Sequence, residues 1–159
     1  MVTTIDVVEF EIGSARYALD IQIAREIVEM IPITRVPRAP AYIAGIINLR
    51  GEITNIIDLK TLLGLESRGE SEVQKIIVLV SEAANGSNVG IIVDDVNSVI
   101  QVPETDIEQI DDAVSNEAYV KGIIKIGEQE SSDGKSKSDL IIWIDIQKIM
   151  REVVSNADM

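Results

Sequence analysis

A short pattern occurs twice in this chain. YIAGII begins at Tyr42, and YVKGII begins at Tyr119, 77 positions later. IVEMIP and VIQVP precede these tyrosines and end at Pro32 and Pro103, whereas NIIDLKTLL and IWIDIQKIM follow them. One such match is expected by chance in an isoleucine-rich chain, but three in the same order indicate a duplication. The sequence therefore predicts two similar structural units.

Each unit is predicted to consist mainly of β-strands. Isoleucine and valine dominate the apolar residues and only 3% of the chain is aromatic, a composition that favours strands over helices. Short apolar runs alternate with turn residues, which is typical of β-barrels or a β-sandwich. An apolar content of 46% in 159 residues indicates a chain of about one domain with a substantial core.

The same pattern places the individual elements. Residues 21–28 fit a helical turn and a strand equally well, and Pro32, Pro37 and Pro40 mark an irregular connection because proline does not fit a central strand. Asp145 is predicted to cap a closing helix over residues 146–154. The expected strands fall at residues 5–12, 16–19, 42–49, 53–59, 75–81, 89–93, 95–102, 119–126 and 140–144, and a mobile polar loop at 127–139.

Several residue types that are missing exclude whole classes of chemistry. The chain has no histidine and no cysteine, so Ser–His and Cys–His nucleophilic sites, disulfides and zinc–thiolate sites are excluded. It also lacks the spacing of a phosphate-binding glycine-rich loop. We therefore expect no enzyme activity and no cofactor.

The charge of the chain limits its partners. The formal net charge of −13 argues against binding to nucleic acid or to anionic membranes. No apolar run approaches the ~18 residues of a membrane span, and the first residues do not resemble a signal peptide. We therefore expect a cytoplasmic protein without direct membrane insertion.

Carboxylates leave one rival open. The adjacent pairs Asp94–Asp95 and Asp111–Asp112 are the candidates for a small acidic β-barrel that binds a ligand or a divalent metal ion. Neighbouring residues in a strand point to opposite faces, so neither pair is typical of two converging carboxylates.

The turn of the predicted hairpin 42–59 contains an arginine that the fold does not require. NLRGE interrupts an apolar run, with Arg50 and Gly51 at its centre. The equivalent tip in the second copy, GEQESSDGKSKSD, has no matching arginine. Arginine suits bidentate recognition of a carboxylate or carbonyl group. We therefore predict that Arg50 is a recognition residue on a turn that the chain would form anyway.

The segment PAYIAGIINLRGEITNIIDLKTLLG resembles the signature of CheW-like domains, the coupling proteins of bacterial and archaeal chemotaxis. FEIGSARYALDIQIAREIVE resembles the first hairpin and following turn of that family, and VGIIVDDV resembles a strand of its second half. The resemblance covers nearly the whole chain. It implies an all-β fold of two intertwined five-stranded SH3-like barrels, with short helices and a C-terminal helix. The implied subdomains are 16–72 with helix 146–154, and 1–15 with 73–145, within one domain over 1–159.

The resemblance also implies a function and partners. A chain with these limits looks like the stand-alone adaptor that links the tips of methyl-accepting chemoreceptors to the regulatory domain of the histidine kinase CheA. It would act at receptor arrays near the inner face of the membrane and be monomeric when free. A coupling protein for a different chemotaxis-like kinase system is the alternative within the same fold.

Residue by residue, the resemblance implies two contact regions. Glu26, Gly45 and Arg50 match receptor contacts, with Asn48 and Leu49 as their immediate support. Ile21 and Ala24 match a region used for docking onto the kinase. Two residues depart from the common pattern: Ala24 is smaller than the branched residues usual there, and Asp95 stands where many members have glycine.

Overall fold

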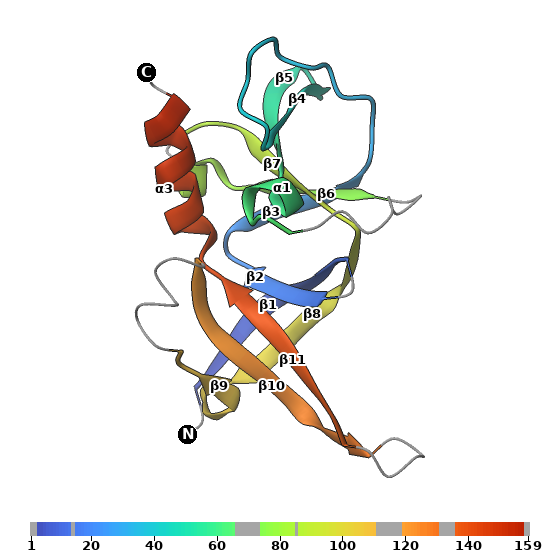
Figure 1. Cartoon of the computed structure of the whole chain (residues 1–159), viewed down its shortest axis with the longest axis vertical. Coiled ribbons are helices and arrows are strands. Elements are labelled where there is room, and N and C mark those ends of the chain that lie inside the picture. The colour runs from blue at the N-terminus through green and yellow to red at the C-terminus, as the bar shows by residue number, and fades with distance from the viewer. Residues whose placement is uncertain are drawn as a thin grey trace.

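The computed structural model describes residues 3–13, 15–65, 74–84, 86–110, 119–130 and 136–157. The described strands form two sheets, which lie one above the other along the long axis of the molecule (Figure 1). The first sheet has the order β8 (Asp95–Pro103), β1 (Thr4–Ile12), β2 (Ala15–Asp20), β11 (Ser136–Ile144), β10 (Val120–Glu130), β9 (Ile107–Glu108). The second has the order β3 (Ala24–Glu29), β6 (Lys75–Leu79), β7 (Val89–Val93), β5 (Glu52–Asp58), β4 (Ile43–Leu49).

Helices occupy little of the described chain. α1 (Leu59–Leu62) follows β5, and α3 (Ile146–Ala157) follows β11. Two short 3-10 helices, η1 (Ser81–Ala84) and η2 (Glu104–Asp106), lie in connections. The predicted mainly β fold with two barrel-like units, short helices and a C-terminal helix is confirmed. One sheet has a sixth described strand because the two-residue β9 pairs with β10.

The sequence repeat corresponds to a repeat in strand topology. The hairpin β4–β5 joins its sheet through a parallel pairing of β5 with β7. The hairpin β10–β11 joins the other sheet through a parallel pairing of β11 with β2. In the second sheet, β7 is followed by β6 and then by β3 at the edge. In the first sheet, β2 is followed in the same way by β1 and then by β8 at the edge. Each sheet is therefore built in the same order from equivalent strands.

The two copies also agree in their hydrogen bonds. The backbone N–H of Asp58 donates to the carbonyl of Tyr42, and that of Asp145 donates to the carbonyl of Tyr119, both at 2.8 Å. Each aspartate then caps a helix, because its side chain accepts a backbone N–H of the following turn at 3.1 Å. The Tyr-to-Asp correspondence seen in the sequence is thus a structural equivalence, and the predicted cap at Asp145 is confirmed.

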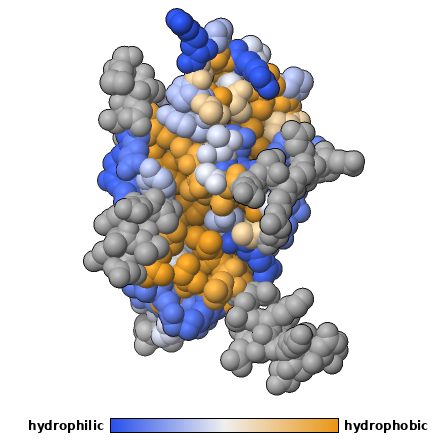
Figure 2. Space-filling model, in the orientation of Figure 1, coloured by the Kyte–Doolittle hydropathy of each residue, from blue (hydrophilic) through white to orange (hydrophobic). Residues whose placement is uncertain are grey.

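The apolar core has three parts, and the largest lies between the sheets. One small cluster, around Ile124 and Trp143, packs against the first sheet, and another, around Ile56 and Ile76, packs against the second. The largest cluster combines residues from both sheets with the apolar face of α3. Figure 2 shows broad hydrophobic surface over the middle of the molecule, close to this junction. The two sheets therefore share one core.

One open alternative is resolved, and two sequence expectations differ from the structure. Residues 21–28 resolve into a turn followed by the strand β3. The strands of the second hairpin extend to Glu130 and start again at Ser136, so the predicted loop 127–139 is mostly paired strand; residues 131–135, its centre, lie outside the described residues. The sheets also divide the chain differently from the expected subdomains, because β2 pairs with β1 and both β6 and β7 belong with β3–β5.

Candidate functional site

The turn between β4 and β5 has the geometry of a type I′ hairpin. Arg50 and Gly51 both have positive φ, 52° and 88°, as this two-residue turn requires. The side-chain oxygen of Asn48 accepts the backbone N–H of Gly51 at 2.9 Å. Asparagine or glycine is preferred at the first central position, because other side chains are strained there. Arg50 therefore occupies a position where its own backbone conformation is unfavourable.

The side chain of Arg50 reaches back across the sheet to Glu26. Its guanidinium Nη2 donates to the carboxylate of Glu26 in an ion pair. Glu26 lies on β3 and Arg50 follows β4, and these are the two outer strands of the second sheet. The ion pair therefore spans the opening between the outer strands. The Arg50 side chain remains 65% exposed, whereas that of Glu26 is 22% exposed.

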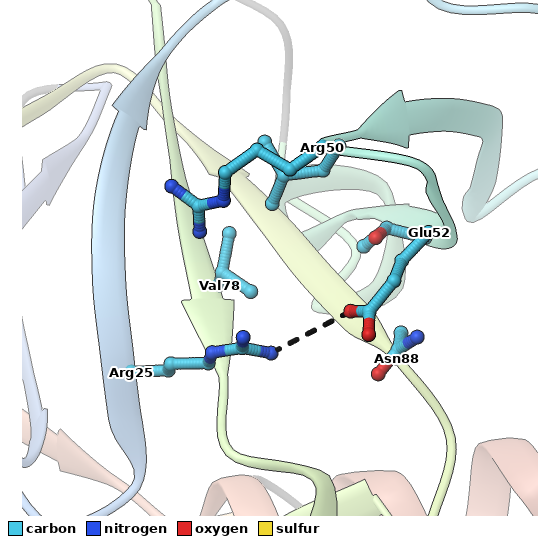
Figure 3. A pocket seen from close by; sticks show the side chains of 7 residues that line it. Arg25, Arg50, Glu52, Val78 and Asn88 are labelled. Carbon is cyan, nitrogen blue, oxygen red and sulfur yellow. Dashed lines mark ion pairs between the residues drawn. The ribbon is translucent and has the colours of Figure 1, made fainter.

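Two more charges surround this pair. Arg25 Nη1 lies 3.9 Å from Glu52 Oε2, and its Nε lies 4.0 Å from Glu26 Oε1. A shallow pocket of about 180 Å³ is bordered by Arg25, Arg50 and Glu52, with Leu49 and Val78 in its lining. Figure 3 shows Val78 between the two arginines and Asn88 beside Glu52. The alternating charges give this end of the barrel a polar rim around a small apolar floor.

Gly45 has a different environment from the other predicted receptor contacts. It is buried and has φ 148°, in the region that favours glycine. A Cβ at this position would overlap the carbonyl oxygen of Thr34 and would lie 2.6 Å from a side-chain carbon of Ile33. Thr34 bridges Ile46 of β4 at this point. Gly45 thus allows the connection after β3 to pack directly on β4.

The predicted kinase contacts lie on and beside a well-fixed turn. Ile21 is 37% exposed, although its backbone N–H is held by the carbonyl of Asp6 at 3.1 Å. Ala24 begins β3 and is partly buried against the core between the sheets. The side chain of Asp20 fixes the start of the turn, because it accepts hydrogen bonds from Trp143 and Lys121. The structure places Ala24 and Glu26 on the same short strand.

Four residues near the site were not predicted from the sequence. Arg25 and Glu52 are neighbours only because β3 and the β4–β5 hairpin meet at one end of the barrel. Ile27 on β3 and Ile53 on β5 are 44% and 59% exposed, and each lies within three positions of Glu26 or Arg50. Both strands contain apolar residues on each face, so alternation does not reveal which isoleucine is exposed. No local feature of the sequence indicates that Arg25 and Glu52 are neighbours, because their proximity depends on how distant strands pair.

The aspartates considered for a metal site have structural partners. Asp94 Oδ2 accepts the backbone N–H of Gly13 at 2.6 Å, and Asp95 Oδ1 lies 3.3 Å from Lys75 Nζ. Asp111 and Asp112 lie outside the described residues. Within the ranges that the structure describes, no three His, Cys, Asp or Glu side chains gather to hold a metal ion.

Comparison with known proteins gives the family. The model of the CheW-like domain matches residues 6–154. The chain belongs to this family. Among relatives, the chemotaxis protein CheW of Thermotoga maritima is 32% identical over 150 residues, covering 93% of this chain and 89% of the relative. The chemotaxis protein CheW of Bacillus subtilis is 35% identical over 122 residues, covering 77% of this chain and 76% of the relative.

A solved structure supports the same family. The crystal structure of the scaffolding protein TtCheW from Thermoanaerobacter tengcongensis matches with a TM-score of 0.73 and 35% sequence identity, and the match covers 89% of each chain. The two-sheet architecture is therefore that of a CheW-like scaffold. Among the described helices of this member, none is long and apolar enough to cross a membrane.

Proposed function

We propose that this chain is a non-catalytic adaptor of chemotaxis. It would join the cytoplasmic tip of a methyl-accepting chemoreceptor to the regulatory domain of the histidine kinase CheA, in the cytoplasm at receptor arrays. Membership of the CheW-like family and the likeness to CheW proteins support this role. An adaptor that holds both partners raises their effective concentration for each other and needs no chemistry of its own.

The conformation of Arg50 is the observation that carries the proposed receptor contact. An exposed ion pair such as Arg50–Glu26 contributes about 0.2–1 kcal/mol. A left-handed conformation at a residue other than glycine costs about 1 kcal/mol or more. The ion pair therefore does not outweigh the strain, and stability alone does not explain an arginine at this position. Recognition of a partner by the exposed guanidinium group of Arg50 explains why an arginine is present there.

The surroundings of Arg50 fit a helical partner. A receptor tip is a helical hairpin, and a helix bound on a surface is held by apolar contacts flanked by charges. Exposed Ile53 pairs with Asn48 across the hairpin and supplies apolar surface next to the turn at Arg50. Ile27, in contrast, follows Glu26 in β3 and points to the opposite face of that strand. Asn48 shapes the turn through its hydrogen bond to Gly51, and Leu49 lines the pocket floor. Gly45 contributes indirectly in this proposal, because it lets the connection at Thr34 pack against β4.

The proposed kinase contact is the turn at Ile21. An exposed isoleucine on a turn held by backbone hydrogen bonds presents an apolar side chain without a large loss of conformational entropy on binding. Ala24 follows on β3, and its small side chain adds little apolar surface to the proposed kinase contact. The proposal places the two partners on neighbouring surfaces, connected by β3.

Replacement of Arg50 by asparagine tests the receptor contact most sharply. Arg50→Asn suits the type I′ turn better than arginine does, so the variant should remain folded. We expect it to lose most co-sedimentation with receptor-tip assemblies while kinase binding stays unchanged. Lys125→Ala is the matched control, because Lys125 is also an exposed cation in an ion pair, with Glu108 on the other sheet. Unchanged receptor co-sedimentation of folded Arg50→Asn would overturn the assignment.

A second substitution tests the kinase contact. Ile21→Asp places a charge in the proposed apolar contact, and we expect weaker binding to the isolated kinase regulatory domain with receptor binding preserved. Leu140→Asp is the control, since Leu140 is an exposed apolar residue on β11. Equal effects of the two substitutions on kinase affinity, measured by titration calorimetry, would contradict a specific role for Ile21.

A further inference from the structure

The connection between β3 and β4 differs in charge from the rest of the chain. Residues 30–42 contain two arginines and no aspartate or glutamate, although the whole chain has 27 acidic and 14 basic residues. The described part of this connection forms the arc at the upper end of the molecule in Figure 1. Figure 2 shows hydrophobic and strongly hydrophilic surface side by side at that end. A local basic and apolar surface thus lies on a strongly acidic protein.

A groove is built into this connection. It has a volume of about 480 Å³, which is within the range of ligand and peptide pockets. Seven of the nine residues that line it are apolar and most of these are small, although polar atoms make up somewhat more than half of its surface; Val36 at its margin is 40% exposed. Pro40 also lines the groove, and Pro37 stands between Val36 and Arg38, so the backbone around it is restricted. The lining consists of Ile33, Arg35, Val36, Ala39, Pro40, Ala41, Ile43, Ala44 and Asp58.

Two arginines in this connection have no acidic partner among the residues that the structure describes. Arg16, Arg25 and Arg50 each face a carboxylate. Arg35 lines the groove, and Arg38 lies two positions after Val36 outside the lining. Both side chains are exposed and make no hydrogen bond or ion pair with the part of the chain that the structure describes. Asp58, the acidic residue of the lining, already accepts Lys60 N–H and the Thr61 hydroxyl, each at 3.1 Å.

We propose that this groove is a docking site for an acidic, partly apolar peptide segment of a partner protein. Apolar side chains of the segment would fill the groove beside Val36, and its carboxylates would pair with Arg35 and Arg38. Arginine is well suited to this, because its fork of donors matches a carboxylate bidentately. The groove is lined by none of the residues assigned above to the receptor and kinase contacts, so the chain would have a third docking surface.

The charge complementarity decides between possible occupants. The two arginines would repel a basic partner, and its contacts with the apolar lining would not offset this repulsion. A purely apolar segment would leave both guanidinium groups without a partner at the edge of the contact. An acidic segment with one or two large apolar side chains satisfies both halves of the surface.

The proposal can be tested with a synthetic peptide and isotope-labelled full-length protein. The probe combines several glutamates with two leucines, and two control peptides replace either the glutamates by glutamine or the leucines by serine. At low salt we expect saturable amide shift changes confined to residues 33–44 and their neighbours on β4. Both control peptides should bind more weakly, and added salt should weaken the glutamate peptide most.

Matched variants separate the groove from general charge. Arg35→Glu with Arg38→Glu should weaken probe binding at least about tenfold, which corresponds to about 1.4 kcal/mol, and Val36→Ser should weaken it without changing its salt dependence. Arg151→Glu with Lys125→Glu is the control, because both residues are exposed cations outside the groove lining and the double replacement changes the charge by the same amount. Arg50→Asn should bind the probe normally, which distinguishes this surface from the receptor contact.

Three results would overturn the proposal. One is the absence of saturable binding, or shift changes located elsewhere on the molecule. Another is equal affinity of the Arg35→Glu/Arg38→Glu variant and the Arg151→Glu/Lys125→Glu variant. The third is a concentration-dependent shift of the same amides without any peptide, together with self-association in sedimentation, which would assign the groove to a second copy of this chain.

Discussion

The hairpins β4–β5 and β10–β11 occupy equivalent positions in the two sheets and differ mainly at their tips. Both begin at a Tyr-x-x-Gly-Ile-Ile motif, both have a register shift just before the glycine of that motif, and both end at a helix-capping aspartate. The first closes in a two-residue turn at Arg50, whereas the described strands of the second extend to Glu130 and Ser136. The shared parts are those that the fold requires. The tip of the first hairpin is free to serve recognition.

The largest predicted difference between the copies concerns their glycines. Gly45→Ala should destabilise the protein by about 3 kcal/mol, because the new Cβ overlaps backbone atoms of Thr34 and the residue has a positive φ. Gly122→Ala should cost about 1–2 kcal/mol, since its nearest contact is a side-chain carbon of Ile107 at 2.9 Å. Urea unfolding of both variants measures this difference. Equal costs would show that the two positions are more alike than the structure indicates.

The helix caps provide the next comparison. Asp145→Ala should cost about 1 kcal/mol and reduce the helical circular-dichroism signal, because α3 loses a cap. Asp58→Ala should cost about half as much, since α1 is a single turn. Asp145→Asn, which retains the capping oxygen, is the control for the loss of charge. A larger effect at Asp58 would mean that the first copy depends on its cap more than the second.

A smaller effect of opposite sign is expected at the first tip. Arg50→Asn removes the strain of arginine in a type I′ turn and loses an exposed ion pair, so the net stability should rise by about 0.5 kcal/mol. Thermal and urea unfolding measure the change. Glu26→Gln, which breaks the same ion pair without changing the turn, should instead lower stability slightly. A large loss of stability in Arg50→Asn would indicate that the arginine is structural.

The smallest effect concerns the tyrosines that begin the two motifs. The hydrogen bond from the Tyr119 hydroxyl to Glu152, with partial burial and the charge of Glu152, raises the pKa of Tyr119 above its usual value of 10.0. Because folding raises this pKa, the contribution to stability is complete below about pH 10 and is lost as pH rises through the folded value. Tyr119→Phe should therefore flatten the loss of stability measured above pH 10, and Tyr42→Phe is the matched control. If stability falls equally steeply above pH 10 in Tyr119→Phe and in the unchanged protein, the Tyr119 hydroxyl does not contribute to the pH dependence of stability.

Much of the fold could be predicted because its signals are local. The positions of most strands follow from apolar runs and turn residues, the turn at Arg50 follows from the polar break NLRGE, and the helix after Asp145 follows from its cap and periodicity. The sequence repeat also predicted that the second half of the chain has the same arrangement of strands as the first. These features depend on residues close together in the sequence, so they can be recognised without knowing which strands meet.

The remaining features depend on contacts between distant segments. The sequence does not show that β2 pairs with β11, or that Arg25 and Glu52 lie within ion-pair distance, because strand register and order are set by packing. For the same reason Glu26 and Arg50 were matched to one surface only through the family resemblance, and their ion pair was not foreseen. The second hairpin was predicted too short because its polar strand ends, Gln129 for example, have the composition of a loop.

The location of the main core has a consequence for synthesis of the protein. That core needs Phe10 and Leu19 from the beginning of the chain and Ile149 and Met150 from α3 at its end. Neither sheet can finish burying its shared face until α3 has left the ribosome, because the parallel pair β2–β11 and the helix both close over long sequence separations. A nascent chain halted before α3 should therefore remain sensitive to protease along both sheets, and protection of both sheets should appear together once α3 has emerged.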